Sequence, residues 1–93
     1  MIVMTEEMFD TIIVGAGPAA LSAAVFTARA NLKTLVIGEP KKSLLTSAAS
    51  IGNYIDTDEM NGVEWLERGI GQIKKYGAQF IEGEVVHVEK RNE

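Results

Sequence analysis

The most informative pattern in the chain consists of two glycines and an alanine: Gly15, Gly17 and Ala20. They form the pattern G-x-G-x-x-A, directly after the apolar run TIIV. This pattern fits the dinucleotide-binding fingerprint, in which the first glycine permits a tight turn, the second admits a pyrophosphate to the backbone, and the small third residue lets a helix pack closely on a strand. The pyrophosphate would then lie at a helix N-terminus, where N–H groups and the helix dipole favour negative charge.

Glu39 is a further candidate for nucleotide binding. It follows Gly15 by 24 residues and stands at the end of the next apolar run, TLVIG. A carboxylate at that place can accept hydrogen bonds from ribose hydroxyls. The glycine pattern alone is a weak signal that also fits a purely structural turn. The flanking runs and Glu39 favour nucleotide binding instead.

The sequence offers few candidate residues for disulfides, metal binding or catalysis. The chain has no cysteine and one histidine, His87. Disulfides, thiolate ligands, a cysteine nucleophile and a multi-histidine metal site are therefore excluded within this chain. No acid, base or nucleophile stands out, so the sequence predicts neither a catalytic residue nor a metal site. That agrees with a protein that positions a cofactor carrying its own chemistry.

Chain length and charge narrow the range of partners and locations that we expect for this protein. Ninety-three residues suffice for one small domain, and the net charge is -4 with nine scattered Lys and Arg residues. A nucleic-acid partner would need a basic stripe. The longest apolar stretch, around 18–26, is broken by Ser22 and is shorter than the ~20 residues that span a bilayer. The start lacks a signal-peptide pattern. We therefore expect no nucleic-acid partner, no membrane association and a cytoplasmic location.

The first half of the chain reads as a βαβ unit. Residues 1–8 are predicted as a lead-in and residues 9–93 as one domain. The run 9–14 predicts a strand buried on both faces, and 18–30 a helix with apolar residues on all sides, as for a helix packed in an interior. Asn31 suits the helix C-terminus because Asn tolerates a left-handed conformation. A second strand is expected at 34–37.

The second half is predicted to continue the α/β pattern. Residues 38–62 look irregular. Apolar residues at helical spacing predict a helix from Val63 to about Lys75, which ends before Gly77. Trp65 on this helix is interpreted as a packing residue. Residues 78–81 and 84–89 predict two further strands. The fold class is therefore α/β with a parallel βαβ core.

Two blocks of sequence carry a family resemblance. The run GAGPAALSAA at 15–24, followed by ARANL at 28–32, resembles the N-terminal FAD-binding segment of thioredoxin reductases. Weaker matches follow in order at 35–37, 52–54 and 83–86, so that the resemblance covers most of 9–88. It implies a partial Rossmann-like FAD-binding domain, of which this chain would be the N-terminal portion.

The resemblance also implies which residues hold FAD. The diphosphate would lie against Gly15, Gly17, Pro18 and Ala19, with Ala20 beside them at the start of the helix. Glu39 would bind the adenosine ribose, and the backbone of Val85 would meet the adenine. Asn53 would approach the flavin ring, although an Asn at such a place also often satisfies loop backbone.

This sequence departs from the family at several places. Lys42-Ser43-Leu44-Leu45 stands where the family usually has Gly-Gly-Gln-Leu, and Ile55-Asp56 stands where Pro-Gly is usual. The acid is one residue later than its commonest position, which is occupied here by Gly38. Lys41-Lys42 is interpreted as a solvated turn that could approach a phosphate. Family members are roughly three times longer, with a nicotinamide domain that this chain lacks.

The expected function is the FAD-binding portion of a thioredoxin-reductase-like flavoprotein. In the parent, the resemblance implies that a hydride passes from NAD(P)H to FAD and onward to an acceptor, and this chain alone would not catalyse it. The alternatives are a stand-alone adenine-nucleotide-binding module without turnover, and a structural domain that no longer binds a ligand. An incomplete sheet leaves an exposed edge and apolar faces, so self-association or a complementing chain is expected.

Overall fold

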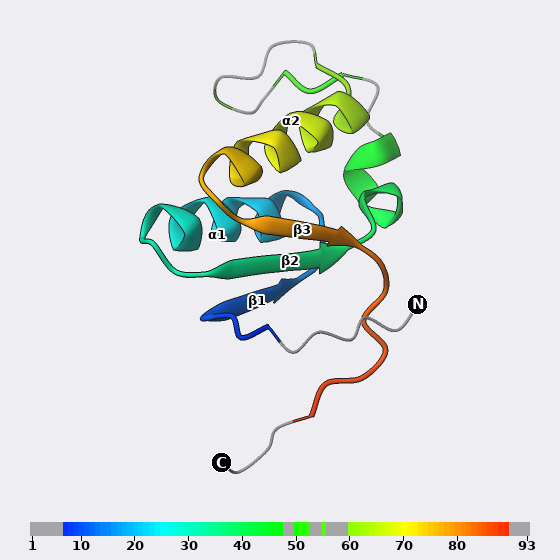
Figure 1. Ribbon diagram of the computed structural model, residues 1–93. Coiled ribbons are helices and arrows are strands. Elements are labelled where there is room, and N and C mark those ends of the chain that lie inside the picture. The colour runs from blue at the N-terminus through cyan, green and yellow to red at the C-terminus, as the bar shows by residue number, and fades with distance from the viewer. Residues whose placement is uncertain (1–6, 48–49, 53–54, 56–59, 90–93) are drawn as a thin grey trace.

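The computed structural model describes residues 7–47, 50–52, 55 and 60–89. The elements follow one another as β1 (Thr11–Val14), α1 (Pro18–Arg29), β2 (Thr34–Gly38), α2 (Gly62–Lys75) and β3 (Gln79–Glu82). The short 3₁₀ helices η1 (Pro40–Lys42) and η2 (Leu44–Ser47) lie between β2 and α2. The alternation of strands and helices confirms the predicted α/β class with its βαβ core (Figure 1).

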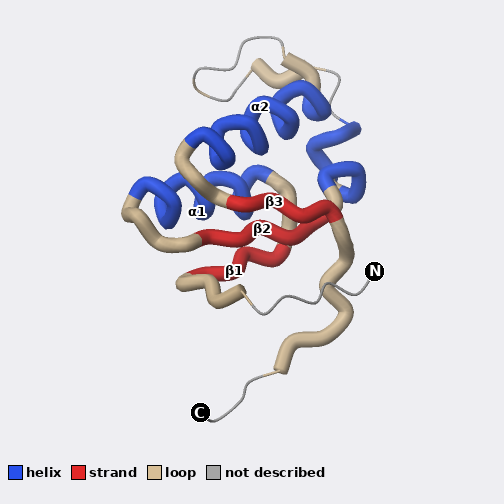
Figure 2. The backbone as a smooth tube through the Cα atoms, in the orientation of Figure 1, coloured by secondary structure: helices blue, strands red, loops and turns tan. Residues whose placement is uncertain are grey.

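The strands form a parallel sheet in the order β1-β2-β3 within the described residues. Ile13 pairs with Val36, and Val36 with Phe80, so these side chains share one face. Each connection steps to the next strand in the same direction. Because such crossovers have one preferred hand, they carry their helices to the same side of the sheet. Figure 2 shows α1 and α2 together on that side.

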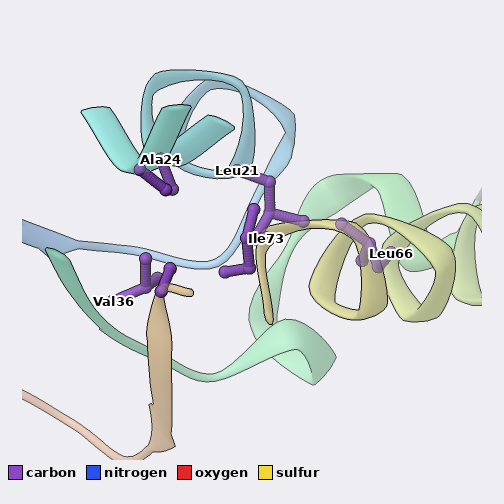
Figure 3. Packing of buried hydrophobic residues seen from close by; sticks show 7 residues of the cluster. Leu21, Ala24, Val36, Leu66 and Ile73 are labelled. Atoms are coloured by element: carbon purple, nitrogen blue, oxygen red, sulfur yellow. The ribbon is translucent and has the colours of Figure 1, made fainter. Parts of the chain in front are cut away.

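The hydrophobic core lies between this helical layer and the sheet. Figure 3 shows α1, β2 and α2 each contributing side chains to it. The buried cluster consists of Leu21, Ala24, Ala28, Val36, Leu66, Ile73 and Ala78. Trp65 packs against this cluster, in the role that its place beside the apolar stripe indicated.

Two predictions of burial are wrong. On the far face of the sheet, which carries no helix in the described part of the chain, Leu35 and Ile37 of β2 are buried but β1 is exposed. β1 is not buried on both faces: Ile12 and Val14 are 54% and 59% exposed. Nor is α1 buried all round, since it buries Leu21, Ala24 and Ala28 but leaves Phe26 77% exposed. β1 and α1 therefore contain apolar residues that the described part of the chain does not bury.

Predicted helix ends agree closely with the structure. Asn31 has a φ of 63°, the left-handed conformation expected directly after α1. α2 begins at Gly62, one residue earlier than predicted, because the Asn61 side chain accepts a hydrogen bond of 2.8 Å from the Glu64 N–H. Such an N-cap satisfies one of the unpaired donors of the first turn. Gly77, with a φ of 97°, ends the turn after α2.

The prediction of a strand at 84–89 is wrong. The Gly83 N–H donates to the Gly38 carbonyl at 3.1 Å, and beyond this bond the described chain runs as irregular coil to residue 89. Val86 and Val88 are 69% and 78% exposed. Their alternation resembles a strand, but the segment turns away from the sheet after β3 (Figure 1) and so has no neighbouring strand along which to pair.

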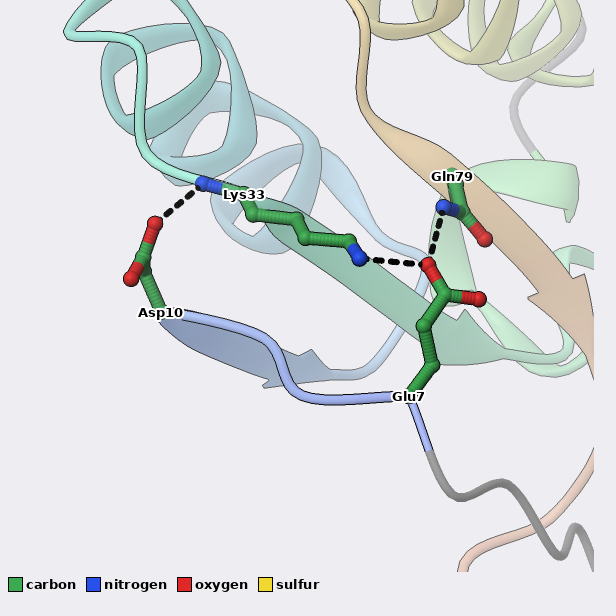
Figure 4. A network of polar contacts seen from close by, with 4 residues as sticks. All are labelled: Glu7, Asp10, Lys33 and Gln79. Carbon is green, nitrogen blue, oxygen red and sulfur yellow. Dashed lines mark hydrogen bonds and ion pairs between the residues drawn. The ribbon is translucent and has the colours of Figure 1, made fainter.

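Glu7 and Asp10, shortly before β1, are tied to the sheet by polar contacts (Figure 4). The Glu7 carboxylate lies 2.7 Å from Lys33 Nζ and accepts a 3.1 Å hydrogen bond from Gln79 Nε2. The Asp10 carboxylate accepts a 2.7 Å bond from the Lys33 N–H. Glu7 thereby links the beginning of the chain to the residues that open β2 and β3. The end of the predicted lead-in is thus anchored.

Candidate functional site

A cavity of about 380 Å³ opens at the carboxyl ends of the three strands. In parallel α/β sheets this edge is where ligands bind. The cavity is lined by Val14, Gly15, Ala16, Gly17, Ile37, Gly38, Glu39, Lys42, Ser43, Gly83, Glu84 and Val85. Four residues predicted from the sequence therefore lie around one space: Gly15, Gly17, Glu39 and Val85.

The two glycines of the turn have different structural reasons. Gly15 has a φ of +128°, which L side chains rarely adopt, and its N–H donates to the Ile37 carbonyl at 2.8 Å. Gly17 has a φ of -87°, which any residue can adopt. A Cβ on Gly17 would project to within 3.4 Å of Ser43 Oγ, and both residues line the cavity. The conformation therefore favours glycine at 15, whereas at 17 the absence of a side chain leaves the cavity open beside Ser43.

The beginning of α1 faces the same region. Pro18 is the first residue of the helix, Ala19 and Ala20 follow, and the Leu21 N–H donates to the Gly17 carbonyl at 3.1 Å. Among the described residues, no side chain caps this end and no acidic residue stands in its first turn. Helix N-termini with this character attract phosphate groups. Pro18, Ala19 and Ala20 do not line the cavity themselves but lie directly after Gly17.

Gly38 explains why the acid stands at 39. A Cβ at Gly38 would lie 2.5 Å from the Gly15 carbonyl carbon and 2.7 Å from the Ala16 nitrogen. Contacts this short with backbone leave no room for a side chain at residue 38. Glu39 is the next residue, it lines the cavity, and its side chain is 30% exposed. Close contact between β2 and the glycine turn thus excludes an acid at residue 38 in this chain.

One lysine, Lys42, contacts both carboxylates of the cavity. Lys42 Nζ lies 2.7 Å from a Glu39 carboxylate oxygen and 4.0 Å from a Glu84 carboxylate oxygen. Hydrogen bonding to Glu39 raises the pKa of Lys42, so the ammonium form is favoured. Lys42 is the only cationic residue among the described residues that line the cavity. The site therefore carries two carboxylates and one ammonium group.

Sequence reasoning missed several of these residues. The sequence patterns give no role to Gly38, Gly83 or Glu84, and they predict Lys42 as a solvated turn residue that could approach a phosphate. The run Lys42-Ser43 in place of two glycines was the signal that could have directed attention to that loop. Asn53, predicted to approach the flavin, lies outside the described residues. Of the residues predicted for phosphate, ribose and adenine, the structure therefore brings four together around one cavity, with 18–20 directly after the second glycine, and it does not describe the flavin contact.

A second cavity, of about 350 Å³, lies between α1 and α2. Phe26, Trp65 and Arg68 are among its lining residues, and no residue predicted for the nucleotide site is among them. No set of three or more His, Cys, Asp or Glu side chains in the described part of the chain could hold a metal ion. The helices described here are all too short or too polar to cross a membrane.

The residues around the cavity fit FAD. A glycine without a Cβ lines the space before an uncapped helix start, which suits a diphosphate, and the Glu39 carboxylate suits ribose hydroxyls. A model of the FAD binding domain family matches residues 10–64, which is more than half of this chain. The chain belongs to the FAD-binding domain family. FAD, the cofactor expected from the glycine turn and the resemblance, is thereby confirmed.

The FAD-binding domain is also similar in sequence to thioredoxin reductases. It is 38% identical over 85 residues to a thioredoxin reductase of Bacillus subtilis, across 89% of this chain and 27% of that protein. The atypical thioredoxin reductase TRi from Desulfovibrio vulgaris Hildenborough is 44% identical, with a TM-score of 0.68 over 76% of this chain and 24% of that chain.

The fold of this FAD-binding domain matches a further solved structure more completely. The thioredoxin reductase from Streptococcus pyogenes MGAS5005 has a TM-score of 0.82 at 29% identity, over 95% of this chain and 29% of that chain. These matches confirm the resemblance to thioredoxin reductases and the partial Rossmann-like fold. The chain spans about a quarter of the length of the relatives it matches.

Proposed function

We propose that this FAD-binding domain works as the cofactor-holding part of a thioredoxin-reductase-like oxidoreductase. One observation carries the proposal: Gly15, Gly17, Glu39 and Val85, far apart in the sequence, line one cavity at the carboxyl ends of the strands. In the whole protein, a hydride would pass from NAD(P)H to FAD and onward to an acceptor. FAD supplies that redox chemistry when bound, and the protein binds and orients it.

The residues have distinct parts in this proposal. The turn at Gly15 and Gly17, followed by Pro18, Ala19 and Ala20, holds the diphosphate at the start of α1. Glu39 accepts hydrogen bonds from the adenosine ribose, and the backbone of Val85 meets the adenine. Asn53 is proposed for the flavin side on the resemblance alone. No residue of this chain is proposed as an acid, base or nucleophile, so turnover is assigned to the whole protein and not to these 93 residues.

Titration of the purified chain with FAD, ADP and NADH tests the proposal. Binding of FAD with a perturbed flavin absorption spectrum is the expected result. An equal response to all three ligands would instead support the alternative, an adenine-nucleotide-binding module without turnover. Absence of any response would contradict nucleotide binding and support a structural domain.

We also infer that another chain or another copy covers the exposed part of the far face of the sheet, at β1, since Leu35 and Ile37 of β2 are already buried on that face. Ile12 and Val14 lie there with about half of their surface exposed, and Val86 and Val88 add exposed apolar surface after β3. Exposed apolar surface of this kind favours association. Sedimentation over a range of concentrations is expected to show self-association, and Ile12→Lys should weaken it. A monomer at all concentrations would leave only the complementing chain. The cytoplasmic location stays a prediction.

A further inference from the structure

Lys42 and Ser43 stand beside the glycine turn although they are distant from it in the sequence. Both line the cavity together with Gly15 and Gly17. Ser43 Oγ is the atom nearest to the position that a Cβ on Gly17 would take, at 3.4 Å. Lys42 is the last residue of η1 and its side chain is 67% exposed, so its ammonium group is free to change partners at small cost.

The cavity is rich in negative charge, so that a diphosphate needs a cation to bind there. Glu39 and Glu84 contribute two carboxylates, and Lys42 contributes the single ammonium group among the described lining residues. A diphosphate brings further negative charge into this space. The start of α1 offsets part of it through the helix dipole, equivalent to roughly half a unit charge. Lys42, the cation held between the two carboxylates, is therefore the lining residue that can offset the remaining negative charge.

We propose that Lys42 and Ser43 are diphosphate-binding residues of this site, where they replace the two glycines usual in the family. The inference rests on the proposed function. Two glycines offer only backbone N–H groups, whereas Lys42 offers an ammonium group and Ser43 a hydroxyl. Lys42 pairs with Glu39 at 2.7 Å before the ligand binds. Ligand binding transfers the ammonium group to the diphosphate and releases the Glu39 carboxylate to the ribose.

The relative strengths of the two contacts favour this transfer. An exposed ion pair such as Lys42–Glu39 contributes little to stability, because water and salt screen it. A charge-assisted hydrogen bond from an ammonium group to a phosphate is roughly twice as strong as a neutral one. The Glu39 carboxylate does not stay unpaired, because ribose hydroxyls replace the ammonium group as donors.

The experiment compares three ligands and two neighbouring lysines. Wild-type chain, Lys42→Ala, Lys42→Arg and the matched control Lys41→Ala are titrated with FAD, ADP and adenosine. Lys42→Ala is expected to weaken FAD and ADP binding about tenfold, the size of one hydrogen bond to a charged group. Adenosine binding should stay the same or tighten, because it has no phosphate and Glu39 is already released. Lys42→Arg should keep most of the affinity, and Lys41→Ala all of it.

Salt dependence gives a second measurement. Affinity for ADP should fall more steeply with salt for the wild type than for Lys42→Ala, because the variant makes one ionic contact fewer. The inference is overturned if Lys42→Ala loses no more ADP affinity than Lys41→Ala, or if adenosine loses as much as ADP. In both cases wild-type binding of FAD still supports the proposed function. If the wild type binds neither FAD nor ADP, the proposed function fails and this inference fails with it.

Discussion

Gly38 at the end of β2 lies directly against Gly15 of the turn after β1. A Cβ on Gly38 would stand 2.5 Å from the Gly15 carbonyl carbon, and no rotation of a side chain relieves contact with a backbone atom. The contact between Gly38 of β2 and Gly15 of the turn therefore sets the distance between the turn and the acid at residue 39. Both line the cavity, so its shape depends on this contact.

Gly38→Ala is expected to destabilise the fold and abolish FAD binding. The added methyl must push the turn away from β2, and overpacking of this kind costs about 1–3 kcal/mol. Urea unfolding and FAD titration measure the two effects. Gly71→Ala is the control, since nothing lies within 4 Å of its added Cβ. It should stabilise α2 by about 1 kcal/mol and leave binding intact. An unchanged unfolding midpoint for Gly38→Ala would contradict the close contact.

Gly17→Val is expected to remove FAD binding while leaving the fold largely intact. The backbone at Gly17 has an ordinary φ of -87°, and the nearest atom to an added Cβ is the Ser43 hydroxyl at 3.4 Å. The protein can therefore accept a side chain that the diphosphate cannot. Circular dichroism checks the fold and flavin fluorescence checks binding. Unchanged affinity would show that the diphosphate does not lie at this turn.

Glu39→Gln is expected to weaken binding of adenosine as well as of FAD, by roughly tenfold, since hydrogen bonds to a charged group are lost. The matched control is Glu82→Gln at the end of β3, an exposed acid that does not line the cavity. Titration with adenosine isolates the ribose contact from the diphosphate. Equal losses for Glu39→Gln and Glu82→Gln would rule out a specific role for Glu39.

Glu7 is expected to make stability depend on pH. Hydrogen bonds from Lys33 and Gln79 lower the pKa of Glu7 below its ordinary value of 4.5. The folded state therefore holds this proton less tightly than the unfolded state. The contribution of Glu7 is fully present above pH 4.5 and is lost as the pH falls through the lowered pKa.

Urea unfolding of wild type and Glu7→Gln at a series of pH values measures this effect. The wild type should be the more stable at neutral pH, and the difference should vanish in acid. Glu89→Gln, at an exposed position after β3, controls for the loss of one charge. A difference between wild type and Glu7→Gln that is constant from pH 7 to acid would show that the ion pair with Lys33 does not stabilise the fold.

Local pattern was sufficient for the βαβ unit. The apolar runs, the glycine turn, Pro18 and Asn31 act within a few residues of one another, so their conformations follow from short-range sterics. The order of strands along the chain also predicted a parallel sheet, because neighbouring strands in a βαβ unit need a helical crossover.

Local pattern was misleading where burial depends on partners. The alternation of Val86 and Val88 is that of a strand, but pairing needs a free neighbouring edge, and the chain leaves the sheet after the bond from Gly83 to Gly38. In the same way, an apolar β1 and α1 indicated burial on all sides. The direction of the crossovers instead placed both helices on one face of the described sheet.

Residue types and spacing alone were enough to predict the glycine turn after the first strand and the acid after the second, and to propose them for phosphate and ribose. The tertiary structure alone decided which residues share the site. Lys42, Ser43, Glu84 and Val85 reach the turn only because three strands end at one edge of the sheet. It also decided that Glu7 contacts Gln79, 72 residues away, since contacts between distant residues arise only when the strands pack side by side.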